Sequence, residues 1–463
     1  MIKFNFFRNL FFVLFSIPVI SQVSTSECME NLSIFAESAK IKNYQAAYEP
    51  WKLVIDNCPK LNLATYQFGE RILKDFIQKS TNDNDKVKYL NELLDMYDSW
   101  AENFPNRKGV NQIGKIFSSK GQAMLDNGIE DKSLIYDTFD FAFVNDSSSF
   151  TNPKSLAYYF ITGYELYKSG TKIELEDLFE KYEELTEKFQ LLKTNISKNL
   201  DVILKKEESG TPLTSSESRN KRIYDINSNA VGSYLQLLDQ TIAKEATCDI
   251  LIPLYSKNFE ENKNNPVWIR RAAGRLDGKD CSDDPLFVTL VEQLHNLEPS
   301  ADSAYYLGIL NDKQGNGEEA LKYYQESVAL QTDNYRKANI LYKIAVKFRN
   351  AGRRVSARDY AEQALSFQPS LGRAYLLISN LYADSANGCG DTQFNKRAVF
   401  WLAAQTAQKA GRVDASLKRL SDRTAAAFNG RAPTKTDIFT EGNEGTTIRF
   451  TCWINRSVRV PSL

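Results

Sequence analysis

The stretch that decides the fold is KFRNAGRRVSARDYAEQALSFQPS, residues 347–370. Its alanines fall three or four residues apart, at Ala357, Ala361 and Ala364. Alanines at this spacing share one face of a helix, and a face without bulky side chains lets a second helix approach closely. Gly352 permits a turn before the helix, and Pro369 ends it. The stretch therefore predicts the second helix of a closely packed helical pair.

The same arrangement recurs along the chain. When Ala338 is counted as the first position, Ala345 falls at the eighth and Ala357 at the twentieth, where the two helices of a pair must cross. A further copy starts at Cys28, and a degenerate one follows it. A two-helix unit repeated about every 34 residues builds a solenoid. We therefore expect an all-α helical-hairpin solenoid, whose best copies are 301–334, 338–371 and 372–411.

The middle of the chain has longer helical patterns. Residues 152–170 resemble the first helix of a pair, whereas 173–206 and 218–246 exceed the length of a repeat helix. The polar run EESGTPLTSSES joins these two long patterns and is typical of a turn. We expect a long helical hairpin inserted in the solenoid. Two roles stay open for it, a partner-binding arm and internal packing.

The end of the chain changes to a period of two. Thr446, Ile448, Phe450 and Cys452 alternate with more polar neighbours, and Glu444-Gly445 provides a turn signal. This pattern predicts a short β-hairpin that covers the last helices. The chain then divides into a leader at 1–21, degenerate repeats at 22–170, the long hairpin at 171–248, C-terminal repeats at 249–428 and the cap at 429–463.

The first residues have the layout of a secretory signal. Lys3 and Arg8 precede an apolar stretch from Leu10 to Ile20, and small Ser21 follows. The alternative is a retained membrane anchor, but the apolar stretch is shorter than the roughly 20 residues that span a bilayer. We expect cleavage after Ser21, no integral membrane segment afterwards, and a location in the periplasm or cell envelope.

Six cysteines lie after this leader. In an exported protein, an even number of cysteines is typical of disulfides. Spacing favours Cys28 with Cys58 and Cys248 with Cys281, each about one helical hairpin apart, which leaves Cys389 with Cys452. A metal site is the alternative, but the cysteines lack CxxC spacing.

Little in the composition points to enzyme chemistry or to nucleic acid. The 463 residues are 42% hydrophobic, and 58 basic residues balance 58 acidic ones, so no net charge favours nucleic acid. The single histidine, His295, lies late in a helical pattern, where histidines commonly satisfy helix carbonyls. No phosphate-binding glycine loop is present. We expect no catalytic residue, no metal and no cofactor.

Two runs add a family resemblance to the repeat frame. They are NGCGDTQFNKRAVFWLAAQTAQKAG at 387–411 and PTKTDIFTEGNEGTTIRFTCWINRSVRV at 433–460. The frame resembles that of tetratricopeptide-repeat (TPR) proteins, and with these runs the chain is similar to an exported group common in Bacteroidota. The resemblance implies a periplasmic or envelope-associated helical scaffold without catalytic residues. Asp302-Ser303-Ala304 and Asp384-Ser385-Ala386 match a glycan-acceptor pattern of that group.

A TPR-like solenoid binds ligands on the concave face of its first helices. Tyrosine and arginine are common anchors of such surfaces. We expect a non-enzymatic scaffold that holds an extended peptide or a helix of a protein partner there. A basic cluster, Arg349 to Arg358, is either an acidic-peptide contact or a solvated surface. The alternatives are a structural subunit of an outer-envelope assembly or secretion complex, and an envelope hydrolase that uses carboxylates. The predicted partner-binding residues are Tyr305, Ile309, Asp312, Asn339, Tyr342, Arg349, Arg373 and Asn380.

Overall fold

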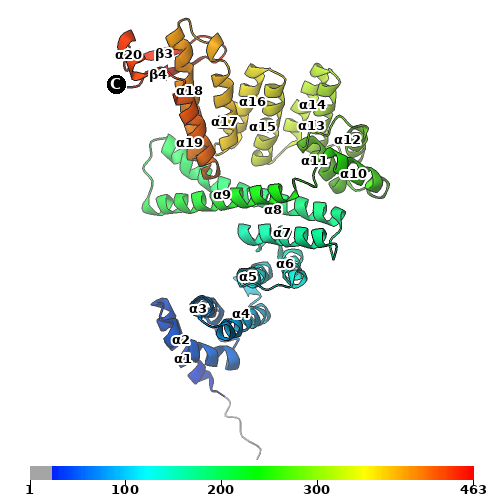
Figure 1. The fold of residues 1–463 in the computed structure, drawn as a ribbon, viewed down its shortest axis with the longest axis vertical. Coiled ribbons are helices and arrows are strands. Elements are labelled where there is room, and N and C mark those ends of the chain that lie inside the picture. The colour runs from blue at the N-terminus through cyan, green and yellow to red at the C-terminus, as the bar shows by residue number, and fades with distance from the viewer. Residues whose placement is uncertain (1–22) are drawn as a thin grey trace, which may run out of the picture. The chain divides into compact units, whose positions relative to one another are not determined.

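The computed structural model describes residues 23–463, which are mostly helical (Figure 1). The predicted leader, 1–21, lies outside the described residues. The chain forms two compact units, one ending at Phe150 and the other beginning at Thr151. Within the described part, no helix combines the length and the apolar character that crossing a membrane requires.

Unit 1 consists of three helical pairs. Helix α1 packs on α2, α3 on α4 and α5 on α6, with a two-residue antiparallel β-ladder between the second and third pairs. The elements are α1 (Thr25–Lys40), α2 (Tyr44–Asn57), α3 (Ala64–Lys79), α4 (Asp83–Asn103), β1 (Asn106–Arg107), β2 (Val110–Asn111), α5 (Ile113–Asp126) and α6 (Lys132–Asp146).

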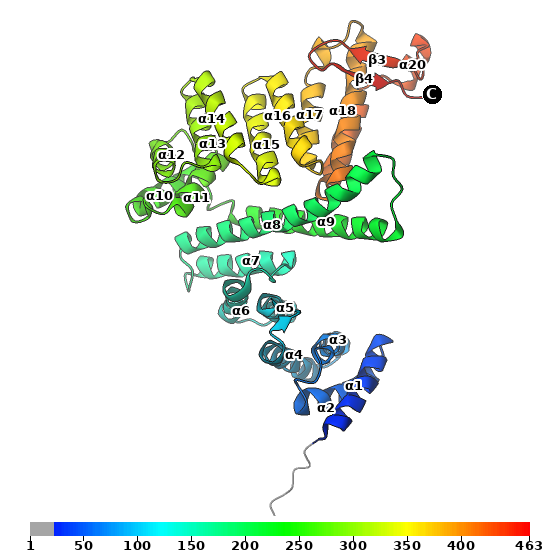
Figure 2. The same ribbon diagram turned by 180° about the vertical axis from the view of Figure 1, so that it is seen from behind.

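Unit 2 also contains successive pairs of packed helices, together with two longer helices. Helices α11 and α12, α13 and α14, α15 and α16, and α17 and α18 are the successive pairs, and both views show them in a row beside α8 and α9 (Figures 1 and 2). The helices are α7 (Pro153–Ser169), α8 (Leu175–Glu208), α9 (Ser215–Ile242), α10 (Cys248–Asn262), α11 (Pro266–Gly278), α12 (Pro285–Leu297), α13 (Ala301–Lys313), α14 (Gly317–Leu330), α15 (Asn334–Asn350), α16 (Arg354–Phe367), α17 (Gly372–Ala383), α18 (Gln393–Val413), α19 (Lys418–Asn429) and α20 (Lys435–Glu441), with short 3-10 turns η1 (Ala386–Gly388) and η2 (Ala415–Leu417).

Small residues set the close contact within the pairs, as the sequence predicts. Ala345 of α15 and Ala357 of α16 are fully buried. Gly352 between these helices has φ +74°, a conformation that disfavours other residues. In the preceding pair, a Cβ atom on Gly308 would lie 2.5 Å from the Tyr324 ring. The predicted all-α solenoid of helical hairpins is confirmed.

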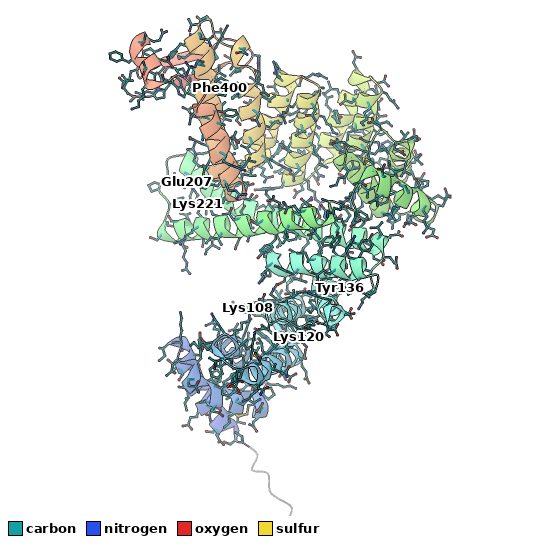
Figure 3. All side chains as sticks on the ribbon, in the orientation of Figure 1. Lys108, Lys120, Tyr136, Glu207, Lys221 and Phe400 are labelled. Carbon is teal, nitrogen blue, oxygen red and sulfur yellow. A yellow bond between two sulfur atoms is a disulfide. The ribbon has the colours of Figure 1, made fainter. Side chains whose placement is uncertain are left out.

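The predicted long hairpin is α8 and α9, joined by a short polar turn. Near the turn, Lys221 of α9 donates to Glu207 of α8 at 2.6 Å (Figure 3). Helix α7 packs on both long helices. The sequence groups α7 with the N-terminal repeats, whereas its contacts lie within unit 2 because its partners are these long helices.

One side of α8 is committed to packing within unit 2. Asp201 accepts hydrogen bonds from the Tyr335 hydroxyl of α15 at 2.6 Å and from the Ser370 backbone N–H at 2.8 Å. Nearer its start, Glu187 pairs with Arg271 of α11 at 3.0 Å. Helix α8 therefore bonds to repeats that do not adjoin one another along the solenoid.

The C-terminal cap contains α20 and a β-hairpin of β3 (Thr447–Phe450) and β4 (Arg456–Arg459). The strands pair antiparallel, with Thr447 opposite Arg459. The hairpin turn lies at 451–455, with Asn455 at φ +45°, and not at Glu444-Gly445, which precedes β3. The predicted turn position is wrong, because a left-handed asparagine supports the turn in place of the glycine.

The three predicted disulfides are confirmed in the structure. Cys28 bonds to Cys58 across the first helical pair, and Cys248 bonds to Cys281 beside α11. Cys389 bonds to Cys452, across a sequence separation of 63 residues. This last bond ties the loop before α18 to the turn of the cap.

Candidate functional site

Four first helices of unit 2 bring polar side chains onto one surface. Lys347 of α15 reaches Asp277 of α11, with 2.8 Å between Nζ and Oδ1. Burial raises the pKa of the Tyr305 hydroxyl of α13, and the charge of the nearby Asp277 carboxylate raises it further. Lys343, one turn before Lys347, places its ammonium 5.0 Å from the centre of the Tyr305 ring. These contacts join three successive repeats through their first helices.

Helix α17 contributes the next part of this surface. The Arg373 guanidinium lies 4.3 Å from the centre of the Tyr342 ring and donates to the Asn339 side-chain oxygen. Its Nε atom is buried and has no hydrogen-bond partner among the described residues. We call the following set the first-helix surface: Asp277, Tyr305, Asn339, Tyr342, Lys343, Lys347 and Arg373.

The first-helix surface carries three cations and one carboxylate, so it has excess positive charge. Surrounding protein lowers the pKa of Lys343, although its side chain reaches solvent. The carboxylates of Asp277 and Asp302 act in the opposite direction, and the positive charges of Arg373 and Lys347 again lower the pKa. Desolvation also lowers the pKa of Arg373.

The structure brings three of the predicted binding residues together, namely Asn339, Tyr342 and Arg373. Two others are in the core: Tyr305 is 3% exposed and Ile309 is 1% exposed. The Tyr305 ring packs against Tyr306 and Tyr324, with centroids 5.5 and 6.0 Å away. Tyr305 therefore supports the surface from below, and Ile309 is not accessible to a partner.

The remaining predicted residues lie apart from this group. Asp312 accepts a hydrogen bond from the Tyr324 hydroxyl at 2.8 Å and so serves its own helical pair. Arg349 is exposed in the last turn of α15, and Asn380 is half-buried in α17. No hydrogen bond, ion pair or ring contact joins any of the three to Asn339, Tyr342 or Arg373.

Sequence reasoning missed Asp277, Lys343 and Lys347. Asp277 belongs to α11, in a part of the chain where no copy of the repeat is recognisable. A signal did exist for the lysines, because residues four apart on a first helix share one face, and Lys343 adjoins Tyr342. Their opposite partner, however, could be found only from the fold.

Other residues that the sequence singles out have structural roles. His295 lies in the last turn of α12, where its Nδ1 atom is 3.1 Å from the Ser303 hydroxyl. Arg358, from the basic cluster, donates to the backbone oxygens of Trp453 and Ile454 at 2.7 and 3.1 Å. It therefore anchors the cap.

The two serines of the glycan-acceptor pattern are buried. Ser303 is 0% exposed and Ser385 is 5% exposed. The Ser385 hydroxyl donates to the Leu381 carbonyl at 2.8 Å and accepts from the Trp453 indole at 3.2 Å. Neither hydroxyl is accessible for modification in the folded chain.

Comparison with known proteins supports the repeat interpretation. No protein-family model matches the chain. Photosystem I assembly protein Ycf3 of Cuscuta gronovii is 30% identical over 112 residues, which cover 22% of this chain and 67% of that protein. The chain belongs to the tetratricopeptide-repeat family. Ycf3 of Acaryochloris marina is 37% identical over 70 residues, covering 15% of this TPR chain and 42% of that protein.

Solved structures give only weak likenesses. A TPR protein from Parabacteroides merdae is 10% identical, with a TM-score of 0.27 over 68% of this chain and 97% of that chain. Yeast Tom70 is 12% identical, with a TM-score of 0.25 over 89% and 82% of the two chains. At these scores the likenesses carry no argument about function.

Within residues 23–463, no group of three or more histidine, cysteine, aspartate or glutamate side chains is placed to hold a metal ion.

Proposed function

We propose that this TPR protein is an exported, non-enzymatic scaffold that binds a peptide segment of a protein partner on its first-helix surface. One observation carries the proposal. Lys343 lies beside Tyr342, on whose ring the Arg373 guanidinium packs, and neither cation forms an ion pair with a carboxylate among the described residues. Two neighbouring cations that no carboxylate pairs with directly favour an anionic ligand.

A peptide carboxylate supplies the missing partner. It can accept from the Lys343 ammonium and from the outer nitrogens of Arg373, while Tyr342 holds the guanidinium plane in place. Each charge-assisted hydrogen bond of this kind contributes about 1.5–3 kcal/mol. The partner's acidic residue or chain end is therefore anchored here, and the rest of the segment follows the row of first helices.

The location is part of the proposal. Three disulfides support an oxidising compartment, and the leader at 1–21 supports export. The runs at 387–411 and 433–460 support a place in the exported TPR group of Bacteroidota. We therefore propose the periplasm or cell envelope as the site of action.

Photocrosslinking in intact cells tests the binding surface. A benzoylphenylalanine at Tyr342 in the full chain should join one reproducible protein, which mass spectrometry identifies. The same group at Phe439, 75% exposed on α20, serves as the control. In the R373E background the Tyr342 product should fall at least tenfold while the chain keeps its thermal stability.

Other outcomes contradict the proposal. A Tyr342 product that is unchanged by R373E removes the role of the carboxylate anchor. Products that arise only from probes on α8 and α9 indicate an assembly subunit instead. Recovery of the chain from the cytoplasm with reduced cysteines removes the proposed location.

A further inference from the structure

A recess on unit 2 lies outside the first-helix surface and shares no residue with it. Its volume is about 390 Å³, within the range of roughly 300–1,000 Å³ that is common for ligand pockets. Helices α16, α17 and α18 form most of its lining, and β4 of the cap contributes one residue. The lining residues are Glu362, Leu365, Tyr375, Ile378, Tyr382, Leu402, Gln405, Thr406, Lys409, Arg412 and Arg456. We call this site the cap pocket.

The lining combines an apolar floor with a cationic rim. Leu365, Ile378 and Leu402 are aliphatic, and Tyr375 is half-buried beside them. The Lys409 ammonium lies 4.9 Å from the centre of the Tyr375 ring. Such a floor suits a bulky apolar group, because burying that group removes apolar surface from water.

The rim has more positive than negative charge. Arg456 is paired with Glu362 at 2.7 Å, and Lys409 is paired with Glu208 of α8 at 3.2 Å. Arg412 is exposed at the end of α18 and forms no ion pair or side-chain hydrogen bond with another described residue. Three cations and one acid line the pocket itself, so its charge complements a carboxylate.

The cap completes the pocket. Arg456 begins β4, four residues after Cys452, whose disulfide to Cys389 fixes this end of the tail. Trp453, beside that cysteine, packs on Tyr382 with ring centroids 6.1 Å apart. One side of the pocket therefore exists only while the tail is docked, and the disulfide helps to dock it.

We propose that the cap pocket is a second peptide-binding site, which takes a bulky apolar side chain next to a carboxylate. The apolar side chain fills the floor, and the carboxylate meets Arg412 and Lys409 at the rim. The inference goes beyond the proposed function, because a partner bound on the first-helix surface requires none of these residues.

Selection from a displayed library of random linear peptides tests this site. The target is the full oxidised protein from which the leader has been removed. Enriched peptides are synthesised with a fluorophore and measured by fluorescence anisotropy. We expect a class with an acidic residue beside leucine, isoleucine, phenylalanine or tyrosine. Its affinity should fall at least about tenfold in R412E and less in R412Q. The matched control is R423E, a charge reversal at an exposed arginine of α19, which should leave the affinity unchanged.

The disulfide gives a second, independent readout. In the double variant C389S/C452S, the same peptides should bind several-fold more weakly, whereas peptides of the first-helix surface keep their affinity. The inference is overturned if no enriched peptide loses affinity in R412E, or if R423E weakens binding equally. Peptides that respond to R373E and not to R412E belong to the first-helix surface and also count against the cap pocket.

Discussion

Replacing Asp201 by alanine should loosen the seam between α8 and the repeats of unit 2. Asp201 is 4% exposed and accepts two hydrogen bonds, from Tyr335 at 2.6 Å and Ser370 at 2.8 Å. Each hydrogen bond to a charged group contributes about 1.5–3 kcal/mol. Burial of the carboxylate, which raises its pKa, offsets part of this gain. We expect D201A to lower the free energy of opening at this seam by about 2–4 kcal/mol.

Asparagine separates the hydrogen bonds from the charge. In D201N the amide oxygen can accept from the Ser370 N–H, and the amide nitrogen can donate to the Tyr335 hydroxyl. We therefore expect a cost of about 1 kcal/mol or less. Hydrogen exchange by mass spectrometry, read on peptides of α15 and α17, measures the opening. D384A, at an exposed aspartate, is the control. Equal exchange in D201A and D384A would refute the bracing role of α8.

The pH dependence of stability, compared between wild type and D201N, tests the direction of the Asp201 pKa shift. Because the folded pKa of Asp201 is raised above its ordinary value of 3.8, the folded chain holds this proton longer than the unfolded chain as the pH rises. As the pH rises from the ordinary pKa to the folded pKa, the contribution of Asp201 to stability therefore decreases. In urea unfolding, wild type should lose stability relative to D201N from about pH 4 towards neutrality. A gain would mean that the hydrogen bonds outweigh burial.

Two further perturbations test the packing. G308A should lower stability by about 1–3 kcal/mol, because its methyl group would meet the buried Tyr324 ring. G317A has open space around its Cβ, so it should leave the melting temperature unchanged or raise it slightly. Replacing Cys389 and Cys452 by serine should destabilise the cap by roughly 4 kcal/mol for a closed loop of 63 residues, measured by thermal unfolding. Equal melting temperatures in G308A and G317A, or an unchanged cap in the disulfide variant, would contradict the respective argument.

The sequence predicts the repeat fold because close helix packing requires small residues at fixed positions, and these are visible in the sequence. A position such as Ala357 or Gly308 tolerates no large side chain, so the requirement is visible in one chain without its partners. The turn of the cap left no such record. Gly445 is a stronger turn signal than Asn455, yet the disulfide of Cys452 and the strand register place the turn beside the asparagine.

The candidate site was predictable only in part, for a related reason. Asn339, Tyr342 and Arg373 follow from the frame, because α15 and α17 belong to clear copies of the repeat. Tyr305 also fits the frame, but neighbouring aromatic rings cover it. Asp277, conversely, lies on the surface without fitting any copy. A frame gives the direction of a side chain, and the neighbouring repeats decide whether a partner can reach it.

Helix α8 affects the first-helix surface, because it bonds to helices that carry this surface. In most repeat proteins each unit contacts only its neighbours, so small rotations between repeats accumulate and the surface changes shape. Helix α8 bonds to α11 through Glu187 and to α15 through Asp201, and it thereby restrains two repeats that are not adjacent in the solenoid. Asp277 and Lys343 lie on these two helices, and Arg373 lies at the start of α17, shortly after Ser370, whose backbone N–H donates to Asp201. A surface held in shape before binding loses less conformational entropy when a ligand arrives. If the proposed function holds, the long hairpin supports recognition by fixing the spacing between Lys343 and Arg373, the cations that a carboxylate of the partner is proposed to meet.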